Sequence, residues 1–150
     1  MIKTLLAIFV LLPFIINAQK IVDNSGENKV FEKIEIEADF PGGTAKWKEF
    51  VRNNFDFSRI EKGLSDSVAS FSDTATIRFV IDRNGIISNF TFQNVISKVF
   101  KESCIQLFKD SPHWRPAIQC GRYVSAYKTQ TFIVQIDKST GKKSVFVREI

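Results

Sequence analysis

Residues 75–92 read ATIRFVIDRNGIISNFTF, and this stretch decides the fold. Its first half alternates apolar and polar side chains, as a strand with one buried face does. The Asn84-Gly85 pair in the middle favours a tight hairpin turn, because both residues tolerate a positive φ. The stretch therefore predicts two long antiparallel strands that share a buried face. That face carries Ala75, Ile77, Phe79 and Ile81, followed by Ile86, Ser88, Phe90 and Phe92.

Two amphipathic segments are expected to cover this Phe-rich surface. Residues 96–110 repeat apolar and small side chains at helical spacing, which predicts a helix. A shorter helix is expected after the turn Phe40-Pro41-Gly42-Gly43, with Trp47, Phe50, Val51 and Phe55 on one face. An antiparallel sheet with two helices on one face is the α+β fold class that these patterns indicate.

The remaining segments are assigned more simply. Residues 34–40 alternate apolar and acidic side chains, which predicts a half-buried strand with its carboxylates in solvent. Residues 56–73 are polar and rich in Ser and Asp, and we expect a long surface loop there. The β-rich run 122–137 predicts a further strand pair, and residues 144–150 a terminal strand.

The N-terminus predicts export from the cytoplasm. Lys3 precedes an apolar run over residues 5–16 and the small-residue site Ile16-Asn17-Ala18, which together are typical of a secretory signal peptide. The run is too short for the roughly 20 residues that a membrane-spanning helix needs. We therefore divide the chain into a signal peptide (1–18), a polar tether (19–29) and one domain (30–150), located in the periplasm.

Composition excludes several classes of function. The chain has 150 residues, one His and two Cys, so it has no set of ligands for a typical zinc site. Loss of Lys3 leaves 20 basic and 16 acidic residues, a net charge of +4 without a basic block interleaved with aromatics. We therefore expect no metal, no cofactor and no nucleic acid partner. A hydrolase that used a Ser and His113 would need a base orienter and an oxyanion site, which no motif suggests, so we expect no enzyme.

Three separated motifs resemble the TonB C-terminal domain, in the form found as a standalone domain in Bacteroidetes-type bacteria. They are Phe40-Pro41-Gly42-Gly43 with Trp47 and Phe50, the run from Arg78 to Ile86, and Ser111-Pro112-His113-Trp114-Arg115-Pro116-Ala117 with Gly121 and Val124. The resemblance extends over residues 31–137. It implies an α+β domain with helices packed on one face of an antiparallel sheet, as the periodicities also do.

The resemblance implies a protein-binding function. Domains of this family offer an open sheet edge to an extended segment of an outer-membrane transporter, which adds a strand to the sheet. The last family strand forms that edge, and here it falls in residues 128–136. We expect the backbone of Thr131, Ile133 and Gln135 to contact the partner, beside the segment Trp114, Arg115 and Pro116, while Phe132, Val134 and Ile136 pack in the core.

The chain also departs from the family. It has neither a long Pro-rich spacer nor a separate membrane anchor, and its tether of eleven residues extends only about 40 Å. The favoured interpretation is a periplasmic binding module that docks on a transporter or another envelope protein without transmitting force. The alternative is a minimal energy transducer whose N-terminal segment stays uncleaved in the membrane. The sequence leaves open whether Cys104 and Cys120 are paired and whether the protein forms a homodimer.

Overall fold

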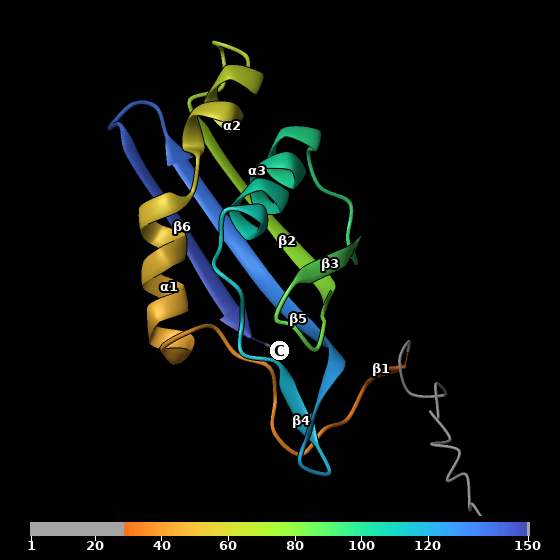
Figure 1. Cartoon of the computed structure of the whole chain (residues 1–150). Coiled ribbons are helices and arrows are strands. Elements are labelled where there is room, and N and C mark those ends of the chain that lie inside the picture. The colour runs from red at the N-terminus through yellow and green to blue at the C-terminus, as the bar shows by residue number, and fades with distance from the viewer. Residues whose placement is uncertain (1–28, 150) are drawn as a thin grey trace, which may run out of the picture.

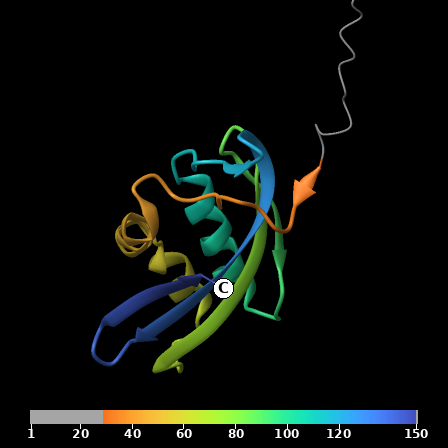
Figure 2. The ribbon, with the colours of Figure 1, turned by 90° about the horizontal axis from the view of Figure 1, so that it is seen from below.

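The computed structural model describes residues 29–149, so the predicted signal peptide and most of the tether lie outside the described residues. The element order is β1 (Val30–Phe31), α1 (Gly43–Asn54), α2 (Phe57–Gly63), β2 (Ser70–Ile81), β3 (Ile87–Phe92), α3 (Lys98–Lys109), β4 (Ala117–Gln119), β5 (Arg122–Asp137) and β6 (Lys142–Glu149). These elements form a curved sheet with the helices on one face (Figure 1, Figure 2). The described part is therefore an α+β domain with three helices, one more than expected.

Strand β5 is the centre of the sheet. It pairs antiparallel with β2 over twelve residues, Ser70↔Asp137 through Ile81↔Ala126. On its other side it pairs antiparallel with β6, from Gln130↔Glu149 to Asp137↔Lys142, and parallel with the short β1. Strand β3 lies beyond β2, and β4 forms a hairpin with the start of β5. The run 122–137 is thus one long strand and not the expected strand pair.

The predicted hairpin forms the buried face as expected along β2. Ala75, Ile77, Phe79 and Ile81 are completely buried. The return strand differs, because a register shift between Arg78 and Val80 places Ile87, and not Ser88, opposite Ile81. Ile86 is consequently exposed, whereas Phe90 and Phe92 still pack against the core.

Two other sequence expectations are wrong. Residues 34–40 form no regular strand: the segment is held by isolated bridges between Ile36 and Ile118 and between Asp39 and Arg115, and the Ile36 side chain is 57% exposed. The expected loop 56–73 contains α2. Asp56 is the N-cap of this helix, and its side chain accepts a hydrogen bond from the Ser58 backbone N–H. The same segment also contains the start of β2. A helix of seven residues offers too few turns for a periodic apolar pattern to be visible.

The residues of the three motifs meet in one aromatic cluster under the helices. Trp47 lies 5.0 Å from Trp114 and 5.2 Å from Phe40 between ring centroids. The backbone N–H of Trp114 donates to the Gly85 carbonyl over 2.9 Å, which connects the hairpin turn to the segment after α3. Such contacts stabilise the fold, so the residues of these motifs pack the core of the domain and do not by themselves indicate a binding site.

Candidate functional site: the open edge of strand β6

The expected edge strand is not an edge. Thr131, Ile133 and Gln135 lie in β5, and each has a register partner in β2 and another in β6. The prediction that residues 128–136 form the open edge is therefore wrong. An alternating strand pattern reports which face of a strand is buried, and it does not report whether a neighbour lies on either side. Phe132, Val134 and Ile136 are buried, as expected.

The segment 114–116 does not form a joint site with those residues. Trp114 is buried in the aromatic cluster, so its side chain packs in the core and is not exposed to a partner. Arg115 forms an ion pair with Asp39 over 2.9 Å, and with Pro116 it lines a hollow of about 310 Å³ near the β4–β5 hairpin. Of the six residues expected to bind a partner, Ile133 is the one that lines the groove described below.

Among the described residues, three strands of the main sheet pair with one strand each: β1, β3 and β6. Strand β1 has only two residues, so it is too short to offer a docking edge. The β3 edge is short and irregular: the register shift lies within it, and Asn89 has a φ of 54°. Bulges of this kind interrupt the regular hydrogen bonding that an added strand needs. Strand β6 pairs with β5 over eight consecutive residues without a shift, so its outer side is a regular edge.

Backbone hydrogen bonds decide which groups of β6 point outward. The Thr76 N–H donates to Asn94 Oδ1 over 2.8 Å and the Thr76 carbonyl accepts from the Gln93 N–H, so both groups point away from β5. In an antiparallel pair, the partner of such a residue also points away, and successive residues alternate. The backbone groups of Thr131 therefore point toward β6, and those of Ile133 and Gln135 do the same.

The same alternation continues into β6. Arg148, Phe146 and Ser144 are the register partners of Thr131, Ile133 and Gln135, so their backbone groups face β5. The intervening residues Lys143, Val145 and Val147 then present their N–H and C=O groups to the outer side. The side chains of Val145 and Val147 are buried on the helix side of the sheet, so only their backbone is offered to a partner.

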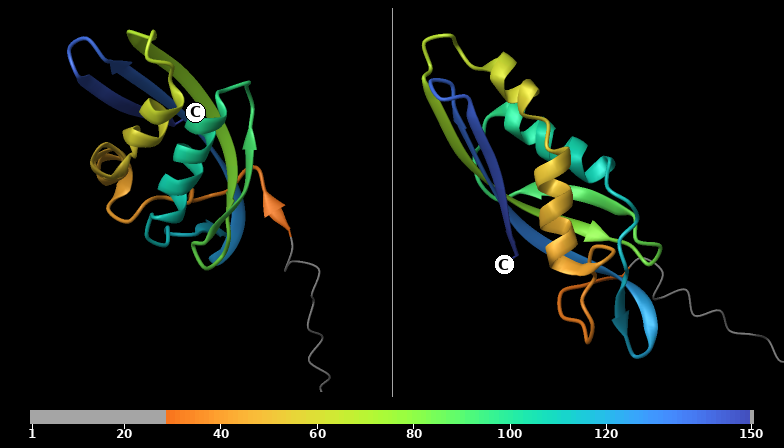
Figure 3. Two further views of the ribbon diagram at one scale, coloured as in Figure 1. Left: turned by 90° about the horizontal axis from the view of Figure 1, so that it is seen from above. Right: turned by 90° about the vertical axis from the view of Figure 1, so that its left-hand side faces the viewer.

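A groove of about 560 Å³ follows this edge. It lies between α1 and β6, two elements that pack against each other and whose ribbons are seen in Figure 3. From β6 it is lined by the four consecutive residues from Val145 to Arg148, and from β5 by Ile133. Phe146 is 54% exposed on the face of the sheet that carries no helix. Lys48 and Arg52 line the groove from α1. An apolar floor beside free backbone groups is what strand addition requires.

The residues of β6 were not among those expected to bind a partner. The segment 142–149 reads KKSVFVRE, in which an apolar core of three residues is bounded by basic ones. Basic residues are common at edge strands, because they discourage unspecific pairing. That composition is the signal in the sequence that could have identified an edge.

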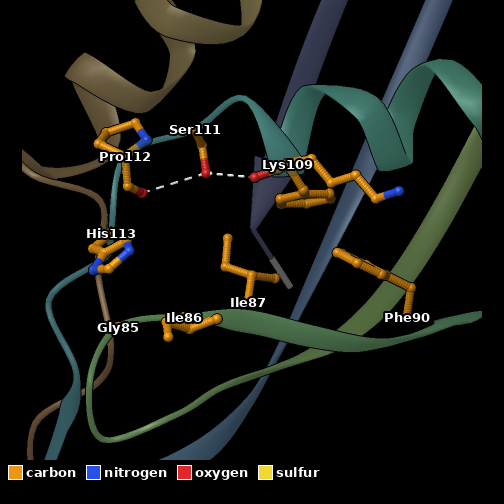
Figure 4. A pocket seen from close by; sticks show the side chains of 9 residues that line it. Gly85, Ile86, Ile87, Phe90, Lys109, Ser111, Pro112 and His113 are labelled. Atoms are coloured by element: carbon orange, nitrogen blue, oxygen red, sulfur yellow. Dashed lines mark hydrogen bonds between the residues drawn. The ribbon is translucent and has the colours of Figure 1, made fainter.

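A second hollow contains His113, and it gives no support to hydrolase chemistry. It measures about 290 Å³ and lies between β3 and the end of α3 (Figure 4). The Ser111 hydroxyl donates to the Phe108 carbonyl over 2.8 Å and accepts from Trp114 Nε1. Among the residues that the structure describes, no hydrogen bond joins a Ser hydroxyl to His113.

Three further observations concern residues 29–149. Both Cys104, which is buried, and Cys120, which is exposed, are free thiols. No cluster of three or more His, Cys, Asp or Glu in the described chain is arranged to hold a metal ion. None of its helices has the length and apolar character to cross a membrane.

Comparison with known proteins identifies no relative: no family model, no curated protein and no solved structure matches this chain.

Proposed function

We propose that this protein is a periplasmic protein-binding module, which takes up an extended segment of its partner by β-strand addition along the outer edge of β6. The observation that carries the proposal is the set of outward backbone groups at Lys143, Val145 and Val147, on a regular edge beside a groove with apolar and basic lining residues. Main-chain hydrogen bonds to such an edge supply affinity, and the groove supplies selectivity. The role is binding, without catalysis.

The partner we propose is an N-terminal segment of an outer-membrane transporter or another envelope protein in TonB-dependent transport. This part of the proposal rests on the resemblance of the three motifs to the TonB C-terminal domain and on the export signal of the sequence. The docking edge in this proposal is formed by residues 142–149 and not by residues 128–136. We retain a binding module, and not an energy transducer, as the proposed role.

A proline at position 145 tests the docking edge. The Val145 N–H points outward, so Val145→Pro removes a donor that the partner would use and leaves the hydrogen bonds between β5 and β6 intact. Val145→Ala is the matched control, because it shortens the same side chain and keeps the N–H. Both variants should retain a folded circular dichroism spectrum.

The assay is photocrosslinking in the native host from a reactive amino acid at Phe146, followed by mass spectrometry. Val145→Ala should capture the same envelope protein as the parent, whereas folded Val145→Pro should lose that capture. A folded Val145→Pro variant that captures the partner at the parental level would contradict strand addition at β6. Capture of no envelope protein by the parent would contradict the proposed function as a whole.

A further inference from the structure

Three cations around the β6 groove lack partners within the described chain. Lys48 and Arg148 form no ion pair there, and Arg52 has only a longer-range attraction to Glu49, whose carboxylate is already bonded to Lys46. Seven other cations of the described chain form ion pairs with carboxylates: Lys46, Arg59, Arg78, Lys98, Arg115, Lys128 and Lys143. None of the described residues that line the groove carries a carboxylate. Its charge is therefore uncompensated and suits an anionic occupant.

Lys48 and Arg52 lie on α1, so they would meet the side chains on the helix side of an added strand. Side chains of a strand alternate between the faces of its sheet, so every second residue of the occupant would lie on the helix side, near α1. Lys48 and Arg52 are four residues apart on α1, and such residues are neighbours on a helix surface at about 5–6 Å between Cβ atoms. Alternate residues of a strand are separated by about 7 Å. Two successive helix-side residues of the occupant can therefore pair with Lys48 and Arg52.

The opposite face of the occupant meets different chemistry. Residues between the helix-side positions would lie on the face without helices, beside Phe146 and Ile133, which are register partners. Both side chains line the groove, and Phe146 is more than half exposed. Apolar side chains would cover this surface. Arg148 follows on the same face and can pair with a carboxylate at the end of the apolar row.

We propose that the β6 edge selects a segment in which carboxylate side chains alternate with apolar ones, with the carboxylates against Lys48 and Arg52 and the apolar side chains against Phe146 and Ile133. This inference rests on the proposed function and adds the chemistry of the partner. A second copy of the same edge is a poor occupant. It would bring a second set of the same unpaired cations, and like charges at an interface oppose association.

The test uses the protein without its predicted signal peptide, residues 19–150, and two blocked nonapeptides. In one peptide Glu alternates with Val, and in the other Gln replaces each Glu. Affinities are measured by calorimetry at low and high salt for the parent, for the double variant K48E/R52E, and for the control K101E/K109E, which makes the same charge change on α3. Val145→Pro is measured with both peptides.

The Glu peptide should bind the parent at least tenfold more tightly than the Gln peptide, and this difference should shrink at high salt. K48E/R52E should reduce affinity for the Glu peptide at least tenfold, while K101E/K109E changes it less than threefold. Equal affinities for both peptides, absence of Glu-peptide binding at 1 mM, or an equal effect of the control would overturn the charge pattern. If Val145→Pro abolishes binding of both peptides while they bind the parent equally, the edge is correct and only the charge pattern is wrong. If Val145→Pro binds as the parent does, the proposed function itself fails.

Discussion

Replacement of Trp47 by Phe should destabilise the domain through one buried hydrogen bond. Trp47 Nε1 donates to Gln130 Oε1 over 2.8 Å, and both side chains are almost fully buried where α1 covers β5. Within the described residues, Gln130 Nε2 has no partner, so Trp47 supplies the one side-chain hydrogen bond of that amide. Its removal leaves the whole amide buried and unsatisfied.

The expected cost follows from two contributions. Leaving a buried acceptor without a partner costs roughly 1–3 kcal/mol. The smaller ring leaves unfilled volume between Phe40 and Trp114, which adds about 1 kcal/mol. Trp47→Phe should therefore lower the free energy of unfolding by roughly 2–4 kcal/mol, measured by urea titration.

A double-mutant cycle isolates the hydrogen bond from the packing. Gln130→Leu removes an amide that is only half satisfied, so it should cost less than Trp47→Phe, roughly 0–2 kcal/mol. With both polar groups removed, the double variant should be more stable than the sum of the single effects by about 1–2 kcal/mol. Additivity of the two changes within about 0.5 kcal/mol would refute the reasoning, because no coupling would then exist between the two side chains.

Three further predictions concern a glycine in the hairpin turn, the cap of α2 and the two cysteines. Gly85→Ala should lower the free energy of unfolding by at least about 3 kcal/mol in urea titration, because φ is +80° and a Cβ would collide with the Trp114 carbonyl. Gly121→Ala, where φ is +70° but the space is open, should lower it by about 1–2 kcal/mol. Equal losses for the two variants would contradict this reasoning. Asp56 caps α2, and the hydrogen bond from the Ser58 hydroxyl holds the pKa of its carboxyl below the ordinary value of 3.8. The carboxylate therefore stabilises the fold above pH 4, and this contribution is lost as the pH falls through the lowered pKa. Asp56→Ala should lower the free energy of unfolding by about 1 kcal/mol at pH 7. A difference in stability between parent and variant that does not shrink below pH 4 would be inconsistent with the cap. A thiol reagent should modify Cys120 alone in the folded protein, since burial strongly raises the pKa of the Cys104 thiol, and titration of two thiols without denaturant would show that assignment to be wrong.

The sequence contains enough information for the buried framework. Ala75, Ile77, Phe79 and Ile81 alternate strictly, and helix α3 repeats its apolar residues at helical spacing, so pattern and fold agree there. Both patterns depend on contacts within one element and its buried face. Predictions from these patterns therefore do not depend on which strands pair with one another.

The docking edge could not be derived in the same way. Whether a strand is an edge depends on pairing with segments that are distant in sequence, and β5 and β6 both present one buried face. The family resemblance ends at residue 137, before β6 begins, so it placed the edge one strand too early. The expectation of a strand at residues 34–40 was wrong for a related reason. Their alternation fits a strand, but within the described chain they pair through only two isolated bridges.

Amide hydrogen exchange along β6 tests the central claim most directly. In the free protein, the N–H groups of Ser144, Phe146 and Arg148 should exchange slowly, while those of Lys143, Val145 and Val147 exchange fast, because only the first set is bonded to β5. Addition of the captured partner segment should slow exchange at Lys143, Val145 and Val147. Unchanged fast exchange at these three residues in the saturated complex would contradict strand addition at β6.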